Sequence, residues 1–184
     1  MRWCVLAMAV SLTAWAAALA LSPSTSPASA RCAHVAAHPH QVSLSATRKA
    51  ALCLINKARD ARGRQTLRVN SDLQLAAKRH NRRMLAADCF QHKCPGEVGL
   101  NRRVRKTGYT KGQKAWGFAE DLGYDNTPRQ MVRGWMHSPF NRRNILNGNF
   151  RDVGLAVGWG APRMGIDDSQ FATYTVVFGW RRAK

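Results

Sequence analysis

Apolar residues recur at helical spacing in four segments of this chain. In the second segment the apolar side chains share one face while Lys and Arg point outward, the pattern of an amphipathic helix with one buried side. Cap signals set the boundaries: Ser45, Asn70 or Ser71, and Thr127-Pro128 favour helix starts, and glycines favour helix ends. The predicted helices span residues 45–63, 70–84, 98–107 and 127–138.

Apolar and polar residues alternate in the remaining ordered segments, which indicates β-strands. The alternation is clearest at residues 153–159 and 174–180, and a further strand is expected near 115–122. Residues 163–170, which contain Gly165, are expected to form the loop of a hairpin. The pattern predicts an α+β fold, with a small antiparallel sheet flanked by about four helices.

The first 30 residues have the composition of an export signal. Arg2 is followed by an apolar run over 5–21, and Ala28-Ser29-Ala30 fits the preference of signal peptidase. An uncleaved anchor is the alternative, and cleavage nearer Ala20 stays open. We expect 1–30 to be a signal peptide, 31–45 an irregular arm and 46–184 the folded domain. The mature chain is expected to be secreted, not transmembrane and monomeric, with retention at the cell envelope as an option.

Cysteine usage agrees with export. Four cysteines follow the signal, and an even number in an exported chain indicates two disulfides, with three connectivities open. Cys89 and Cys94 enclose a short loop that can bring them within bridging reach, which leaves Cys32 for Cys53. A zinc site made of Cys89, His92 and Cys94 is the competing interpretation.

The net charge points to anionic partners. The chain has 29 Lys and Arg against 10 Asp and Glu, a formal net charge of +19. Basic residues cluster at 48–49, 59–64, 78–83, 102–106, 142–143 and 181–184. Such a surface gathers anions, so we expect nonspecific binding of anionic cell-wall polymer, anionic lipid or extracellular DNA. No motif for sequence-specific nucleic-acid recognition is found.

Six segments carry a resemblance to a known family. The stretch from Trp135 to Leu146 resembles the W-x-x-S-P-x-H-R-x-x-I-L pattern of the bacterial CAP (SCP-like) extracellular domains. Ala119-Glu120-Asp121-Leu122-Gly123-Tyr124 is similar to the family's G-E-N-I-A-Y, with departures at Ala119 and Asp121. The other similar segments are 53–59, 73–84, 89–97 and 152–158. The resemblance implies a three-layer α-β-α sandwich.

The same resemblance implies a polar cavity. It places His92 and Glu120 in that cavity and puts Asn141 where the family has a second histidine, with His137 four residues earlier. His92 and Glu120 are candidate metal ligands, because imidazole and carboxylate suit zinc. No cofactor is required, although a weakly bound divalent cation such as zinc is conceivable. His80 is expected to bond a polar group in the core.

The sequence favours a binding role over catalysis without excluding an enzyme. No G-x-S-x-G, H-E-x-x-H or P-loop pattern occurs, and Asn141 removes an ionisable group from the cavity. We therefore predict a secreted CAP/SCP-domain protein that acts as a non-catalytic binding or interaction module with a degenerate cavity and a basic surface. The alternatives are a metal-dependent hydrolase of peptide or cell-wall material and a carrier of lipid or sterol.

Overall fold

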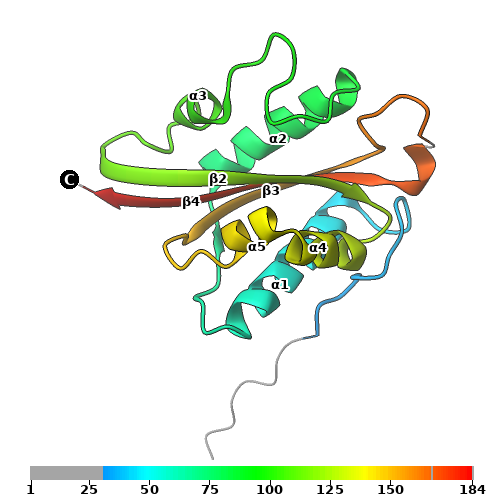
Figure 1. Ribbon diagram of the computed structural model, residues 1–184, viewed down its shortest axis with the longest axis horizontal. Coiled ribbons are helices and arrows are strands. Elements are labelled where there is room, and N and C mark those ends of the chain that lie inside the picture. Colours follow the sequence, from blue (N-terminus) through cyan, green and yellow to red (C-terminus); the bar gives the residue numbers. More distant parts are fainter. Residues whose placement is uncertain (1–30, 167, 184) are drawn as a thin grey trace, which may run out of the picture. The chain divides into compact units, whose positions relative to one another are not determined.

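A computed structural model describes residues 31–166 and 168–183 (Figure 1). The export signal predicted for residues 1–30 lies outside them. The helices are α1 (Leu44–Asp60), α2 (Ser71–Ala86), α3 (Leu100–Arg105), α4 (Pro128–His137) and α5 (Pro139–Ile145). The strands are β1 (Arg68–Val69), β2 (Gln113–Asp125), β3 (Asp152–Trp159) and β4 (Ala172–Ala183). A short 3-10 helix, η1 (Asp168–Gln170), lies in the loop between β3 and β4.

Side-chain caps fix where three of the helices begin. Asn70 accepts hydrogen bonds from the amides of Asp72 and Leu73, and Thr127 accepts one from Gln130, as their positions in the sequence suggest. The cap of α1 is Ser43 and not Ser45, so that helix starts earlier than expected. Pro128 occupies the first turn of α4, where a missing N–H costs nothing.

The sheet has the strand order β1-β3-β4-β2. β3 and β2 both pair antiparallel with β4, whereas β1 runs parallel to β3 through Arg68 and Val69. The expectation of an antiparallel sheet is therefore wrong at one edge, and the sheet is mixed. A strand of two residues is too short to show alternation, which is why the sequence pattern missed it.

Helices cover both faces of this sheet, which confirms the α+β sandwich. α1, α4 and α5 lie on one face, and α2 and α3 lie on the other (Figure 1). Trp135, Tyr174 and Phe178 are fully buried on the first side, and Leu73 and Val104 on the second. The α2 layer rests directly on β3, because a Cβ atom added at Gly154 would lie 2.1 Å from the Leu73 carbonyl carbon.

Two disulfides connect the chain outside the sheet. Cys32 bonds to Cys53 and so ties residues 31–42 to α1, while Cys89 bonds to Cys94. The competing zinc site of Cys89, His92 and Cys94 is therefore wrong, because its two thiols are consumed in a disulfide. None of the helices within the described residues is both long enough and apolar enough to cross a membrane.

Candidate functional site

β2 carries two adjacent carboxylates that face opposite layers. Successive side chains of a strand point to opposite faces, and here Glu120 contacts Arg103 of α3 while Asp121 contacts Asn144 of α5. Both side chains are buried. Because β2 is an edge strand, the loop that follows α2 can reach Glu120 from the open side of the sheet.

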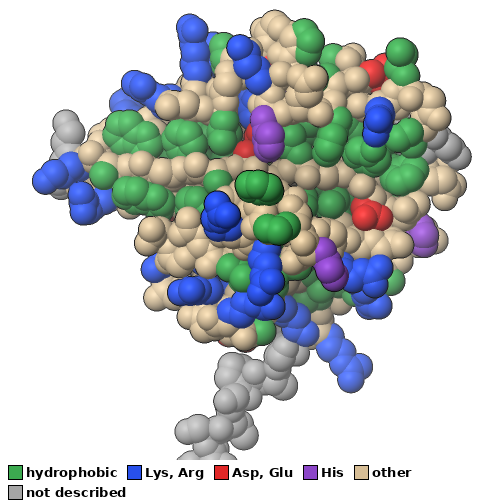
Figure 2. Space-filling view, viewed as in Figure 1, with side chains coloured by type: hydrophobic (Ala, Val, Ile, Leu, Met, Phe, Trp, Pro, Cys, Tyr) green, Lys and Arg blue, Asp and Glu red, His purple; other side chains and the backbone are tan. Residues whose placement is uncertain are grey.

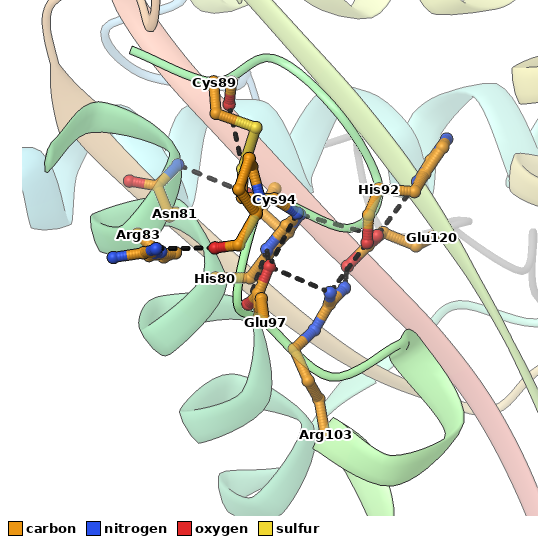
Figure 3. Close-up of polar contacts among 11 residues, drawn as sticks. His80, Asn81, Arg83, Cys89, His92, Cys94, Glu97, Arg103 and Glu120 are labelled. Atoms are coloured by element: carbon orange, nitrogen blue, oxygen red, sulfur yellow. Dashed lines mark hydrogen bonds and ion pairs between the residues drawn. A yellow bond between two sulfur atoms is a disulfide. The ribbon is translucent and has the colours of Figure 1, made fainter. Parts of the chain in front are cut away.

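Glu120 is the centre of a polar network (Figure 3). His92 Nδ1 lies 2.9 Å from Glu120 Oε1, and Arg103 donates through Nη2 to Glu120 Oε2. His80 Nε2 lies 3.8 Å from Glu120 Oε1. The structure therefore brings together His92 and Glu120, and it adds a buried arginine and a second histidine to them.

The same network fastens the loop that carries His92. His80 Nδ1 lies 2.9 Å from both carboxylate oxygens of Glu97, which also accepts the Cys94 amide at 3.2 Å. Arg103 donates to the backbone carbonyl of His92 at 2.7 Å. His80 thus bonds a polar side chain, as expected, although Glu97 lies in a loop and is only partly buried. These contacts brace the disulfide loop against α2 and α3.

Glu120 and His92 differ greatly in their exposure to solvent. The side chain of Glu120 is 1% exposed and that of His92 is 67% exposed. Burial alone would raise the pKa of Glu120, but the hydrogen bond from His92 and the charge of Arg103 hold that pKa below its usual value. The hydrogen bond to Glu120 in turn raises the pKa of His92. His92 and Glu120 thus form a hydrogen-bonded pair that is open to solvent on the His92 side, and both pKa shifts favour the charged forms of the two groups.

A catalytic metal does not fit this arrangement. Both oxygens of Glu120 already have partners, and one partner is the guanidinium of Arg103, whose positive charge opposes a nearby cation. Zinc sites use three or four protein ligands. Within the described ranges, no group of three His, Cys, Asp or Glu side chains is placed to hold a metal ion. The geometry describes a structural ion pair.

Zinc titration tests this interpretation of the ion pair. We expect isothermal titration of the oxidised protein at neutral pH to give no binding in the micromolar range, because zinc would have to displace both a proton and Arg103. The matched control is Glu120→Ala. Micromolar binding to the parent protein that this variant loses would contradict the ion-pair interpretation and restore His92 and Glu120 as metal ligands.

The other predicted cavity residues lie elsewhere. His137 is at the end of α4, where its Nδ1 lies 2.7 Å from the Arg133 carbonyl oxygen of the same helix. Asn141 is half-buried in α5. The α5 residue that reaches β2 is Asn144, whose Nδ2 donates to Asp121 Oδ1 at 2.7 Å. Assignment of Asn141 and His137 to a cavity stays a prediction.

Asp121 is an unusual buried acid. It is 0% exposed, and its Oδ2 has no hydrogen-bond partner among the described residues. Burial raises the pKa of Asp121 to about 7, although the bond from Asn144 opposes the rise. Sequence analysis noted this position only as a departure from the G-E-N-I-A-Y pattern.

Surface cavities share one property, which is positive charge. Each of five cavities on the described part of the chain, with volumes of about 250 to 580 Å³, is lined by at least two Arg or Lys residues. Asp152 is the one carboxylate among all of their lining residues. Figure 2 shows many Lys and Arg side chains, and few acidic ones, over the layer of α1, α4 and α5.

Two of these cavities lie on the loops that follow α1 and α5. Arg64, Arg142 and Arg143 line one, and Arg68 and Arg151 line the other. Within the described residues the arginines in ion pairs are a different two, at positions 103 and 181. We call these five side chains, at 64, 68, 142, 143 and 151, the arginine surface; it lacks carboxylate partners.

Comparison with solved structures supports the fold. An outer surface protein of Borrelia burgdorferi is similar with a TM-score of 0.63 and 17% identity, covering 78% of this chain and 98% of that one. An extracellular SCP-domain protein of Bacillus anthracis is similar with a TM-score of 0.55 and 20% identity, covering 77% and 44% of the two chains. A cysteine-rich secretory protein of Staphylococcus aureus gives 0.52 and 18%, covering 74% and 38%.

Sequence comparison identifies the family. Uncharacterized protein YkwD of Bacillus subtilis is 28% identical over 122 residues, which are 61% of this chain and 43% of that protein, so the chain matches less than half of that relative's length. The sequence pattern of the cysteine-rich secretory protein family, CAP, matches residues 52–177. This match spans both helix layers and the sheet between them. The chain therefore belongs to the CAP cysteine-rich secretory protein family.

Proposed function

We propose that this protein is a secreted, non-catalytic binding module that is held at the cell envelope by anionic polymers. The observation that carries the proposal is the arginine surface. Its five guanidinium groups have no carboxylate partner within the described residues. Arginines without carboxylate partners on α5, on β1 and on the loops beside them create a positive field that favours an anionic ligand.

The chemistry of guanidinium narrows the ligand class. Arginine forms two parallel hydrogen bonds to phosphate or carboxylate and is less strongly hydrated than lysine. The cavity lined by Arg64, Arg142 and Arg143 has a volume of about 480 Å³, enough for a phosphate group with its neighbouring polyol. Further cationic cavities lie on α3 and beside α1. Cations spread over several elements suit a long flexible polymer better than a flat bilayer.

The alternative functions have less support. A metal-dependent hydrolase would need ligands that the network around Glu120 does not provide, because Arg103 and His92 hold both carboxylate oxygens. A carrier of lipid or sterol would need an apolar cavity. Each of the five cavities described above has at least two arginine or lysine side chains in its lining, which a neutral apolar ligand does not favour. DNA remains an outcome of the binding test rather than the proposed ligand.

The test compares two variants that lose the same charge. The first variant replaces Arg64, Arg142 and Arg143 by glutamine. The control variant makes the same replacement at three exposed residues elsewhere, Arg79, Arg82 and Lys111. We expect fluorescence anisotropy with labelled poly(glycerol phosphate) at low salt to show a loss of roughly tenfold or more for the first variant and a much smaller loss for the control.

Three further readouts sharpen this test. Binding should weaken steeply with added salt, because displaced counterions drive it. Neutral dextran should not bind, and duplex DNA with the same number of phosphates should bind no more tightly than the polymer. Equal losses in both triple variants would show that only net charge matters and would contradict the arginine surface as the site.

A further inference from the structure

The outer edge of β3, on the side away from β4, is only partly covered. β1 pairs with it at Asp152 and Val153. Two residues further along β3, at Leu155, the side chain of Gln74 from α2 takes the place of a strand. Its Nε2 donates to the Leu155 carbonyl at 2.7 Å, and its Oε1 accepts from the Leu155 amide at 3.2 Å.

Val157 is the next residue that presents its backbone to this edge. Alternate residues of a strand direct N–H and C=O to the same side, so Val153, Leu155 and Val157 share the outer edge. Within the described ranges no group bonds to the Val157 backbone there. At the following position, Trp159, the ring of His40 packs at 5.0 Å between centroids. The open position is thus bounded at both ends.

A cavity lies at the open position. Its volume is about 250 Å³, and Val157 and Ala156 of β3, Gln74 and Lys78 of α2, and Leu44, Ser45 and Arg48 of α1 line it. Two of these side chains are cationic and none is acidic. Neither Arg48 nor Lys78 has a carboxylate partner among the described residues. An unpaired backbone position beside two such cations is complementary to a peptide that carries a carboxylate.

We propose that this cavity binds the C-terminal end of an extended peptide. The peptide backbone forms hydrogen bonds with the N–H and C=O of Val157, in either strand direction. Its α-carboxylate lies between Arg48 and Lys78. A chain end fits better than a continuous strand, because Gln74 already occupies Leu155 and stops the added strand from running further. The cations select a carboxylate over an amino terminus.

This site is separate from the arginine surface. The residues that line it lie on α1, α2 and the outer edge of β3, and it shares no lining residue with the two arginine-surface cavities. The two proposals can therefore fail independently.

The test uses acetyl-Ala-Ala-Ala with a free carboxylate and ¹⁵N-labelled protein in NMR titrations. We expect the amide of Val157 to shift on binding in the millimolar range, with smaller shifts at Ala156 and Gly158. Two altered probes separate the contributions: the C-terminal amide removes the negative charge, and methylation of the central backbone nitrogen blocks pairing. Each should bind about tenfold more weakly.

Paired variants complete the test. Replacing Arg48 and Lys78 by glutamine should weaken the acid about tenfold, to the level of its amide. Replacing Arg142 and Arg143 by glutamine removes the same charge and should leave peptide binding unchanged. The proposal would be overturned if the NMR shifts were spread over the basic surface, or if the methylated peptide bound as tightly as the unmodified one. Equal effects of the two double variants on peptide binding would also overturn it.

Discussion

Replacing Arg59 by methionine is expected to lower the free energy of unfolding by about 3 to 5 kcal/mol. Arg59 is 0% exposed and has no carboxylate partner among the described residues. Its guanidinium instead donates to four backbone carbonyls, those of Gln65, Ile145, Asn147 and Phe150, at 2.6 to 3.1 Å. Methionine fills much of the volume but leaves these buried acceptors without their donor.

Chemical denaturation measures this loss, with Arg62→Met as the matched control. Arg62 is exposed and lies just after α1, and its side chain bonds only to the Ala58 carbonyl, so its replacement should change stability by less than about 0.5 kcal/mol. A loss for Arg59→Met no larger than that of the control would show that the carbonyls are satisfied without the guanidinium. The connection between α1 and the loop after α5 would then need another explanation.

Replacing Asp121 by asparagine is expected to stabilise the protein above neutral pH. The pKa of Asp121 rises from 3.8 in a free side chain to about 7 in the folded protein. Between these values the folded state holds a proton that the unfolded state has released, so stability falls as pH increases from 3.8 to about 7. The full cost above pH 7 is at most about 4 kcal/mol, and asparagine, which stays neutral, removes it.

Thermal unfolding at a series of pH values checks this sign. Asp121→Asn should match the parent protein near pH 4 and exceed it increasingly up to pH 8, where a gain of roughly 2 to 4 kcal/mol is expected. Exposed Asp60 provides the control, since Asp60→Asn should follow the parent curve. A gain that is the same at every pH would mean that folding does not raise the pKa of Asp121, which contradicts the account.

The sequence predicted the elements that are long and periodic. α1, α2, α4, β2, β3 and β4 each overlap the range that residue spacing predicted, although the cap of α1 is Ser43 and not Ser45. α5 was missed because Ser138-Pro139 was interpreted as the end of α4. In the structure Ser138 ends α4 and also begins α5, with Pro139 in its first turn. One Ser-Pro pair can thus mark two helix boundaries.

The candidate site was only partly predictable. Family motifs led to His92 and Glu120, which the structure places 2.9 Å apart. The partners Glu97 and Asn144 depend on the packing of separate elements, which periodicity does not encode. Arg59 and Arg103 were counted with exposed basic clusters, but both are buried. Charge type alone does not show whether a guanidinium faces solvent or buried oxygen atoms.

The central claim is that binding resides in the arginine surface and not in the His92–Glu120 pair. Co-sedimentation with isolated anionic wall polymer tests it most directly, using the parent protein, His92→Ala and the variant with glutamine at positions 64, 142 and 143. We predict that His92→Ala, which changes a mostly exposed side chain, sediments like the parent while the triple variant stays in solution. Loss of sedimentation in His92→Ala with retention in the triple variant would contradict the claim.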